Sequence, residues 1–399
     1  MKIFIVTAGS FPVGMAAINR ILCHCKGFIK NEAKVKVICL KTTERLKRGI
    51  FNKISKGVYN GIDFEYSSGT TIRGESFIKR RLQDLVGLIN AFFILRNANA
   101  RNKVDALILF SNSLVYIIYF FVITKLLSIT YIQEKDEFPF VSRKLSLLGR
   151  FYTRLYISYV YKAFDGMLVM TKRLKKYFQN KIRKNSKLLL VPMTVEPERF
   201  LKRYRIPTQA PYIAYCGAPG GNKDGVPILI ESFFIISKKY KTIKLKIIGD
   251  SPDTNILIEL KNLAKKLKIE DKVVFTGRVA RDKIPEYLCN ASILALSRPR
   301  SLQSYMAFPS KLGEYLSTGN PVVVTKVGEI PNYLIDGESA FLAEPDSSEA
   351  FAEKLDYVLL HPELAKKVGL KGREIALKHF NYKTQAKRII NFIDELNQR

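Results

Sequence analysis

The stretch Ala307-Phe-Pro-Ser-Lys-Leu-Gly-Glu-Tyr-Leu-Ser-Thr-Gly-Asn-Pro-Val-Val-Val324 decides the fold of this chain. Pro309 suits the beginning of a helix, because its missing N–H and fixed φ fit the first helical turn. Gly319 suits the end of the same helix, and the apolar run that follows predicts a buried strand. A helix followed at once by an apolar strand is the repeating unit of a parallel α/β sheet.

The first turns of that helix gather three chemical groups. Ser310 and Glu314 are four residues apart and therefore share one face, and Lys311 is three residues from Glu314. The ammonium and the free amides of the helix end suit a phosphate, whereas the carboxylate suits the hydroxyls of a ribose. A capped helix with a surface ion pair explains the same residues, so both interpretations stay open.

Similar units extend on both sides of this stretch, where short apolar runs alternate with segments of helical periodicity. The predicted strands are Ile3–Thr7, Val35–Leu40, Ala106–Phe110, Ile129–Gln133, Met167–Met170 and Leu188–Val191, then Tyr212–Cys216, Lys244–Ile248, Val273–Thr276, Ile293–Leu296, Pro321–Thr325 and Ala340–Leu342. Strands that are apolar from end to end and alternate with helices predict parallel sheets covered on both faces.

The fold class is therefore α/β, with two Rossmann-like, doubly wound parallel-sheet domains facing across a cleft. A chain of 399 residues has the length for two such domains. The Pro-rich, charged residues 197–211 predict the linker. We expect an N-terminal domain over 1–195, a C-terminal domain over 196–381, and a final amphipathic helix (382–399) that packs back on the first.

The composition is that of a globular protein, with 47% apolar and 25% charged residues, but the formal net charge is +31. Residues 1–200 carry 35 Lys and Arg against 13 Asp and Glu. Such a field attracts polyanions, so nucleic acid and an anionic membrane surface are both candidate partners. Lysines on ordinary solvated faces would give the same count. The five cysteines predict a reducing compartment.

Two basic and apolar stretches suit helices that lie in the headgroup region of a membrane, although each would equally suit a helix packed into the core. They are Phe77–Leu95 and Leu147–Tyr156. The apolar run Leu114–Ile123 is too short to span a bilayer and predicts a buried helix between two strands. Met1–Val6 predicts a first strand rather than a secretory signal. Any membrane association is therefore expected to be peripheral, on the cytoplasmic side.

Three further loops follow predicted strands, where open parallel sheets bind their ligands. The first, Gly217-Ala-Pro-Gly-Gly-Asn-Lys-Asp-Gly225, offers Gly217, Gly220, Gly221, Lys223 and a helix end as a diphosphate cradle, or is an ordinary glycine-rich turn. The second contains Gly14 and Met15. The third crowds Glu134, Asp136 and Glu137, whose repulsion would raise one pKa and provide a proton acceptor, unless the turn is merely solvated.

Several other chemistries lack support in the sequence. The three histidines are far apart and have no suitable sequence neighbours for a Ser/His/Asp triad. Cys23-His-Cys25 falls inside a predicted helix, where residues two apart point in different directions. No Asp-x-Asp follows a predicted strand, so a metal-held nucleotide diphosphate is not indicated. We expect no metal and no cofactor, with lysines, arginines and helix ends meeting the phosphate charge.

Taken together, the motifs resemble retaining glycosyltransferases of the two-Rossmann (GT-B) type, sequence family 4. The similar segments are Pro192–Phe200, Gly217–Gly225, Ile248–Asp250, Val273–Val279, Ile284–Leu288, Phe308–Val324, Gly328–Pro331 and Asp336–Gly337. The match covers about residues 187–397, and the N-terminal half matches only in layout.

The resemblance implies roles for individual residues. Lys223 corresponds to the lysine that binds the donor diphosphate, and Glu314 to the second glutamate of the Glu-x7-Glu motif, which binds the ribose. Gly249 belongs to the donor loops, while Arg278 and Val279 lie where the family holds the base. Pro309, Ser310 and Lys311 form the Phe-Pro-x-Lys variant of the motif, and we assign Lys223, Lys311 and Glu314 as catalytic. Gly14, Met15, Glu134 and Asp136 would contact the acceptor.

Two residues depart from the family pattern. Met306 stands where the first glutamate of the motif would fall, and Ala218 replaces the arginine that precedes the family lysine by five residues. We suspect that Lys311 supplies the missing charge.

The resemblance implies a sugar transferase that uses a nucleotide-sugar, UDP- or GDP-linked, and retains configuration without a metal. The acceptor would be a saccharide or lipid-linked molecule in polysaccharide or glycolipid assembly, at the inner face of the cell membrane. Three alternatives stay open: an inactive nucleotide-sugar binding protein of the same fold, a sugar-nucleotide epimerase, and a nucleic-acid binder, although the last lacks any recognition motif.

Overall fold

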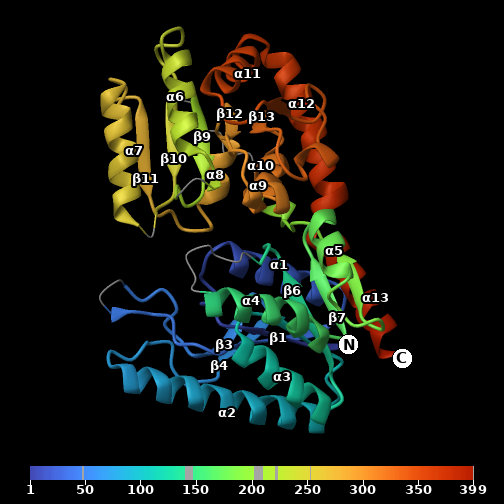
Figure 1. Ribbon diagram of the computed structural model, residues 1–399. Coiled ribbons are helices and arrows are strands. Elements are labelled where there is room, and N and C mark those ends of the chain that lie inside the picture. Colours follow the sequence, from blue (N-terminus) through green and yellow to red (C-terminus); the bar gives the residue numbers. More distant parts are fainter. Residues whose placement is uncertain (47–48, 140–146, 202–209, 221–222, 252, 399) are drawn as a thin grey trace. The chain divides into compact units, whose positions relative to one another are not determined.

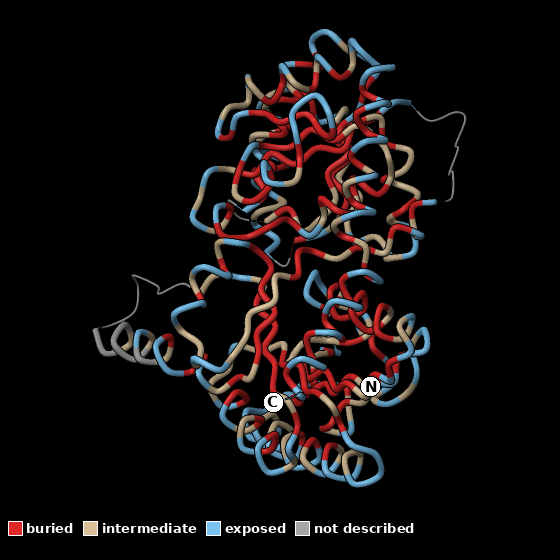
Figure 2. Tube along the Cα trace, turned by 90° about the vertical axis from the view of Figure 1, so that its right-hand side faces the viewer, coloured by how far each residue is buried: buried red, intermediate tan, exposed pale blue. Residues whose placement is uncertain are grey.

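The structure is a computed structural model, and it describes residues 1–46, 49–139, 147–201, 210–220, 223–251 and 253–398. Contacts within the chain divide it into two compact units. Unit 1 comprises Met1–Thr194 together with Tyr382–Arg399, and unit 2 comprises Val195–Asn381. The strands form the buried centre of each unit (Figure 2).

Among the described residues of unit 1, eight strands form one sheet in the order β3-β4-β2-β1-β5-β6-β7-β8. Their bounds are β1(Lys2–Thr7), β2(Lys34–Cys39), β3(Lys56–Tyr59), β4(Ile62–Tyr66), β5(Ala106–Phe110), β6(Thr130–Lys135), β7(Gly166–Val169) and β8(Lys187–Leu190). Neighbours pair in parallel, except that β3 and β4 form an antiparallel hairpin at one edge. That hairpin comes from residues 41–80, whose sequence shows no clear periodicity.

Helices connect these strands and cover the sheet (Figure 1). They are α1(Ala16–Lys30), α2(Phe77–Arg101), α3(Leu114–Leu126), α4(Leu147–Tyr159) with the 3₁₀ turn η2(Val160–Ala163), α5(Lys172–Gln179) and α13(Tyr382–Asn397). The C-terminal helix α13 packs against α1, and both contribute to one apolar core with β1 and β2. The last residues of the chain therefore complete the core of unit 1.

In unit 2, six strands among the described residues form a parallel sheet in the order β11-β10-β9-β12-β13-β14. Their bounds are β9(Tyr212–Cys216), β10(Lys244–Ile248), β11(Val273–Gly277), β12(Ile293–Leu296), β13(Val322–Thr325) and β14(Phe341–Ala343). The accompanying helices and turns are η3(Pro197–Phe200), α6(Val226–Ser237), α7(Thr254–Lys266), α8(Ile284–Cys289), α9(Leu302–Met306), α10(Ser310–Thr318), η5(Ile330–Asn332), α11(Ser348–Leu360), α12(Pro362–Ile375) and η6(Ala376–Phe380).

The fold class predicted from the sequence is confirmed, and each of the twelve predicted strands forms within two residues of its expected bounds. One prediction was half wrong. The run Leu114–Ile123 is helical, but Val115, Ile118 and Val122 are exposed, so this helix is buried on one face only. No helix in the described part of the chain is long and apolar enough to cross a membrane. Most of the predicted linker, residues 202–209, lies outside the described residues.

The contact between α1 and α13 leads to a first prediction. A Cβ added to Gly27 would lie 2.6 Å from the carbonyl oxygen of Tyr382 and would overlap the Cβ of Ala386. Gly→Ala inside a helix ordinarily stabilises by about 1 kcal/mol. Here overpacking should cost about 1–3 kcal/mol, so we expect Gly27→Ala to lower the melting temperature.

Thermal unfolding followed by circular dichroism measures this effect. Asn97→Ala is the control, because it raises helix propensity at an exposed position of α2 and meets no partner helix. A melting temperature of Gly27→Ala equal to or above that of the parent chain would contradict the close approach of the two helices.

Candidate functional site

The loops after β9 and β12 lie side by side at one edge of the unit 2 sheet. The strand order places β9 and β12 next to each other although the chain visits β10 and β11 between them, so the winding direction reverses at this point. Open parallel sheets bind ligands at such a reversal, beyond the carboxyl ends of the strands. The Ser297 hydroxyl donates to the Gly225 carbonyl oxygen at 2.7 Å and thereby ties the two loops together.

Gly217, the first residue after β9, lets a lysine approach the backbone. Its φ of +154° is one that L side chains rarely adopt, and an added Cβ would overlap the Lys311 ammonium. Lys311 itself belongs to the first turn of α10. The sequence reasoning named both residues without relating them, and the structure brings them into contact.

The Lys311 ammonium is held by one group of β9 and one group of the loop that follows β9. It donates to the Tyr215 hydroxyl at 2.9 Å and forms an ion pair with the Asp224 carboxylate. The Tyr215 hydroxyl in turn donates to Asp224 Oδ2 at 2.8 Å. Burial alone would raise the pKa of Asp224, but the Lys311 ammonium holds it below its usual value. Burial lowers the pKa of Lys311, because desolvating the ammonium outweighs the attraction of Asp224.

A second cation lies near this pair. Arg298, in the loop after β12, is only 1% exposed, and its positive charge acts on both Asp224 and Lys311. Its carbonyl oxygen accepts a hydrogen bond from the Thr325 hydroxyl at 2.7 Å. Two cations and one carboxylate therefore lie close together next to a glycine-lined strand end, and cations at such a position suit an anion.

Glu314 lies on the same helix as Lys311 and forms an ion pair with Arg199. Arg199 Nη1 lies 2.7 Å from Glu314 Oε1, and its Nη2 donates to the Arg281 carbonyl oxygen at 2.7 Å. The Glu314 side chain is 23% exposed. The carboxylate is thus fixed in place by an arginine that precedes it by more than a hundred residues.

The remaining predicted donor residues are spread along the same sheet edge. Lys223 is exposed just before α6, and Arg278 is exposed directly after β11, followed by the half-buried Val279. The Gly249 N–H donates to the Gly277 carbonyl oxygen at 3.1 Å, and that of Gly220 to Ala218 at 2.8 Å. Pro309 is the N-cap of α10, and Ser310 is its exposed first residue. Gly221 lies outside the described residues.

In unit 1, the loop after β1 also lies where the winding reverses, between β1 and β5. Met15, the N-cap of α1, is 62% exposed. Gly14 lies tightly against Ile18, since an added Cβ would be 2.5 Å from its Cγ1. The loop is anchored by Tyr66, whose hydroxyl donates to the Phe11 carbonyl oxygen and accepts from the Phe11 N–H, both at 2.9 Å.

Glu134, at the carboxyl end of β6, is buried in an ion pair. Its Oε1 lies 2.7 Å from Arg20 Nε, and its side chain is 1% exposed. Burial alone would raise the pKa of Glu134, but the Arg20 charge holds it below the usual value. The pKa of Asp136 is instead raised, first by burial and then by repulsion from Glu134. The neighbouring Lys135 is buried as well, and burial lowers its pKa to about 8.

His24 has an acidic partner that its sequence neighbours did not indicate. Its Nε2 lies 3.4 Å from Glu134 Oε2, and its side chain is fully buried. Burial lowers the pKa of His24, which favours the neutral ring. Sequence spacing gave no signal of this pairing, because α1 and β6 are joined only by the tertiary fold. In the described part of the chain, no group of three His, Cys, Asp or Glu side chains is arranged to hold a metal ion.

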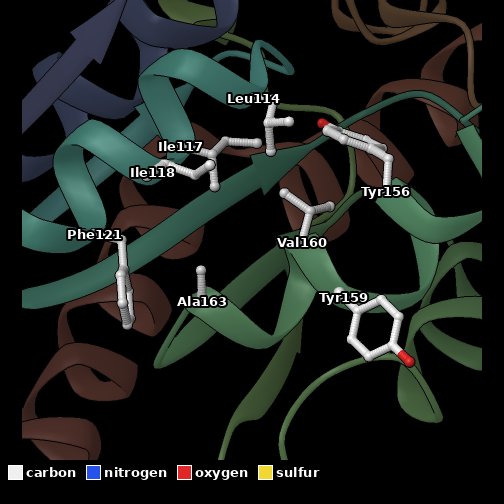
Figure 3. Close-up of a pocket in the computed structure, with 8 residues that line it drawn as sticks. All are labelled: Leu114, Ile117, Ile118, Phe121, Tyr156, Tyr159, Val160 and Ala163. Carbon is white, nitrogen blue, oxygen red and sulfur yellow. The ribbon is translucent and has the colours of Figure 1, made fainter. Parts of the chain in front are cut away.

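An apolar groove of about 400 Å³ lies between α3 and the α4–η2 segment (Figure 3). It is lined by Leu114, Ile117, Ile118, Phe121, Tyr156, Tyr159, Val160 and Ala163. The Tyr156 hydroxyl donates to the Asn112 carbonyl oxygen at 2.6 Å. Its lining suits hydrocarbon better than a charged ligand.

The residues that sequence reasoning missed are those that fix the predicted ones in place. They are Arg199, Tyr215, Asp224 and Arg298 in unit 2, and Arg20, His24 and Lys135 in unit 1. Asp224 had a weak signal, because it follows Lys223 in a loop already singled out. The others had none, since each meets its partner only through sheet and helix packing.

The Lys311–Asp224 pair leads to a second prediction. Both side chains are largely buried, so Lys311→Met should leave the Asp224 carboxylate without its ion-pair partner and lower the unfolding free energy by about 3–5 kcal/mol. The double variant Lys311→Met/Asp224→Asn should lose less than the sum of the single variants. Urea unfolding at neutral pH measures all three.

Lys371→Met is the matched control, because it removes a lysine from an exposed ion pair with Glu374 whose side chains are 65% and 64% exposed. We expect a change of at most about 1 kcal/mol there. Strict additivity of the two single variants would show that Lys311 and Asp224 do not interact.

Comparison with known proteins identifies the family of this site. Residues 196–375 match the family model described as glycosyl transferases group 1. The mannosylfructose-phosphate synthase of Agrobacterium fabrum is 26% identical over 49% of this chain and 43% of its own length. A GDP-mannose-dependent phosphatidylinositol monomannoside mannosyltransferase of Mycolicibacterium smegmatis is 23% identical over 43% of this chain and 44% of its own length. The chain thus matches less than half the length of each relative.

Solved structures match over almost the whole chain. A sucrose-phosphate synthase from Thermosynechococcus elongatus has a TM-score of 0.76 at 15% identity, covering 99% of this chain and 98% of that one. The Anabaena protein Alr3699/HepE, in complex with UDP, has a TM-score of 0.69 at 14% identity, covering 99% and 100%. Identities this low show the fold alone. Residues 196–375 therefore belong to the glycosyl transferases group 1 family, and the chain has the GT-B fold of these enzymes, as its sequence motifs indicated.

Proposed function

We propose that this protein transfers a sugar from a nucleotide-sugar donor to an acceptor hydroxyl, with retention of configuration. One observation carries the proposal: a glycine-lined strand end in unit 2 holds Lys311, with Asp224 and Arg298 close to it, where the sheet winding reverses. A diphosphate is the part of a nucleotide-sugar that would pair with a cation at this position. The family match to residues 196–375 supports the same assignment.

The donor would be held by residues of the same sheet edge. The diphosphate would lie near Gly217, Gly220 and Gly249, whose lack of side chains would let it approach the backbone closely. Lys223, exposed at the beginning of α6, and Lys311 would face its oxygens. A bound diphosphate would attract the Lys311 ammonium, which would then interact with both the phosphate and Asp224.

The nucleoside would extend along the sheet toward β11. Glu314 would accept hydrogen bonds from the two ribose hydroxyls, and Arg199 already fixes the orientation of its carboxylate. Arg278 and Val279, at the end of β11, would contact the base. UDP and GDP are both supported: the Anabaena structure holds UDP, and the mycobacterial relative depends on GDP-mannose.

The chemical step needs charge stabilisation more than a protein nucleophile. The bond between the anomeric carbon and the phosphate oxygen breaks while the acceptor oxygen bonds to that carbon from the same face. The departing phosphate takes the proton of the acceptor hydroxyl. Lys223 and Lys311 would stabilise the negative charge that builds on the phosphate, which lets the reaction run without a metal.

The acceptor would be a saccharide or a lipid-linked molecule of polysaccharide or glycolipid assembly, bound by unit 1 at the inner face of the cell membrane. Met15 is exposed beside Gly14 in the loop after β1, and Asp136, which directly follows β6, would accept a hydrogen bond from an acceptor hydroxyl. Glu134 would not contact the acceptor directly, because its side chain and that of its partner Arg20 are both buried.

A second candidate function is nucleotide-sugar binding without transfer. Met306 is buried and apolar where the family motif has a glutamate, so it offers no hydrogen bond to a sugar hydroxyl. An epimerase of the same fold would instead convert its donor without an acceptor. Turnover of a radiolabelled nucleotide-sugar with and without acceptor separates the three possibilities.

The third prediction tests the proposed donor site. UDP- and GDP-linked sugars should be screened by thermal shift, because a ligand that binds only the folded state raises the melting temperature. Lys223→Ala should reduce sugar transfer from the donor so identified by about 100-fold or more, as removal of a charge-stabilising donor does in other enzymes.

Lys241→Ala is the matched control, since Lys241 is exposed before the amino end of β10, at the opposite edge of the same sheet. It removes the same charge from unit 2 and should leave transfer unchanged. Near-parental transfer by Lys223→Ala would refute the assigned role of this lysine.

A further inference from the structure

Helix α2 uses only a narrow face to pack on its sheet. Its buried residues are Gly87, Ala91 and Leu95, which recur every four residues. The exposed large apolar residues of the helix are Phe77, Ile78, Leu82, Leu85, Val86, Ile89 and Phe93, with exposures from 44% to 71%. From Ile78 onward they recur every three or four residues, on the side of the helix opposite the buried one. The outward face of α2 is therefore apolar rather than polar.

Helix α3 has the same arrangement. It buries Tyr116, Ile117, Phe120, Ile123 and Thr124. On its opposite side, Val115, Ile118, Val122 and Leu126 are 50% to 71% exposed. A helix that covers a sheet in a soluble protein normally presents polar residues outward.

The two apolar faces form one surface, because α2 and α3 lie side by side. The Tyr119 hydroxyl of α3 donates to the Leu88 carbonyl oxygen of α2 at 2.5 Å, and Asn99 Nδ2 of α2 donates to the Leu127 carbonyl oxygen at 3.0 Å. Figure 1 shows both helices next to each other along the outer side of unit 1. We call their outward apolar residues the α2–α3 face. A patch of ten large apolar side chains, six from α2 and four from α3, points to a contact with an apolar partner.

Basic residues accompany the apolar ones. Helix α2 contains Lys79, Arg80, Arg81, Arg96 and Arg101 but only one acidic residue, Asp84. Arg81 lies over the ring of Phe77 at 4.9 Å from its centre, so its charge sits next to the apolar surface. Unit 1 as a whole has 38 basic against 13 acidic residues, whereas unit 2 has 28 against 22. The positive charge of the chain is thus concentrated in the unit that carries this face.

We propose that the α2–α3 face binds an anionic lipid bilayer, with α2 and α3 lying in the headgroup region. Apolar side chains flanked by lysine and arginine are the chemistry that anionic membranes attract. A second copy of this chain fits less well, because a symmetric dimer would place two strongly positive units against each other. The proposal rests on the proposed function only in giving the acceptor its membrane location; binding itself needs no turnover.

The apolar groove next to α3 continues this surface inward (Figure 3). Ile118 belongs to both, since it is 53% exposed on the face and also lines the groove. Tyr159 is 63% exposed on the opposite wall. A groove of about 400 Å³ has room for part of a hydrocarbon chain, which a bilayer supplies and a polar protein surface does not.

Co-sedimentation with phosphatidylcholine vesicles, with and without phosphatidylglycerol, tests the proposal. We expect binding only when phosphatidylglycerol is present, and weaker binding as salt is raised. The variant Leu82→Ser/Ile89→Ser/Phe93→Ser should bind at least about 100-fold more weakly, because three large side chains no longer enter the bilayer. The affinity of Lys79→Gln/Arg96→Gln for these vesicles should fall by about 25-fold, or about fivefold for each charge removed.

Each variant has a control in unit 2. Ile258→Ser removes an apolar residue that is 55% exposed, and Lys241→Gln removes an exposed charge. Both should bind vesicles like the parent chain. Unchanged melting temperatures would establish that the α2 variants fold. The nucleotide-sugar should still raise the melting temperature of these variants, because their substitutions lie outside unit 2. Conversely, Lys223→Ala should keep full vesicle binding, which separates failure of this proposal from failure of the proposed function.

The chain contains no Trp, so a single introduced Trp reports its own environment. When vesicles are added, the fluorescence emission of the Trp in Phe93→Trp should shift to shorter wavelength, and brominated phosphatidylglycerol should quench it. The emission of Tyr357→Trp, at a site 44% exposed in unit 2, should not change. Equal binding to neutral vesicles, full binding by the triple Ser variant, or a dimer that the triple Ser variant dissociates would each overturn the proposal.

Discussion

The candidate site of unit 2 depends on one constraint: a buried ammonium needs a neutralising group close to it. Lys311 meets that requirement through Asp224 and Tyr215, and it can approach the end of β9 only because Gly217 has no side chain. The arrangement joins α10 to the glycine-rich loop and holds a positive site at the sheet edge. An anion that binds there would replace part of the neutralisation that the protein now provides by itself.

The two units use buried charge differently. In unit 1, Arg20 and Glu134 neutralise each other next to a histidine whose pKa burial lowers, and Arg20 also donates to the carbonyl oxygens of Val191 and Pro192. That cluster joins α1, β6 and the end of β8 and serves the fold. In unit 2, Lys311 and Arg298 lie near the Asp224 carboxylate, beside the glycine-rich loop after β9. The family match to residues 196–375 supports unit 2 as the candidate for phosphate binding.

A second constraint concerns the α2–α3 face of unit 1: a large exposed apolar patch is unfavourable in water unless a partner covers it. The α2–α3 face leaves large side chains exposed at positions where a solvated helix would have polar ones. Its lysines and arginines would favour the anionic partner proposed for this face. The proposed membrane contact in unit 1 and the proposed nucleotide-sugar site in unit 2 use different residues.

The sequence by itself determined the α/β class, the strand positions and the helix from Ser310 to Thr318, because apolar periodicity, Pro309 and Gly319 act locally. It also pointed to Gly217 and Lys311 as separate signals. Only the tertiary structure decided that they touch, that Arg199 holds Glu314, and that His24 meets Glu134. It likewise decided which side of α2 faces outward. The physical reason is that periodicity records which residues share a helix face, whereas a pairing between distant segments depends on how sheets and helices pack.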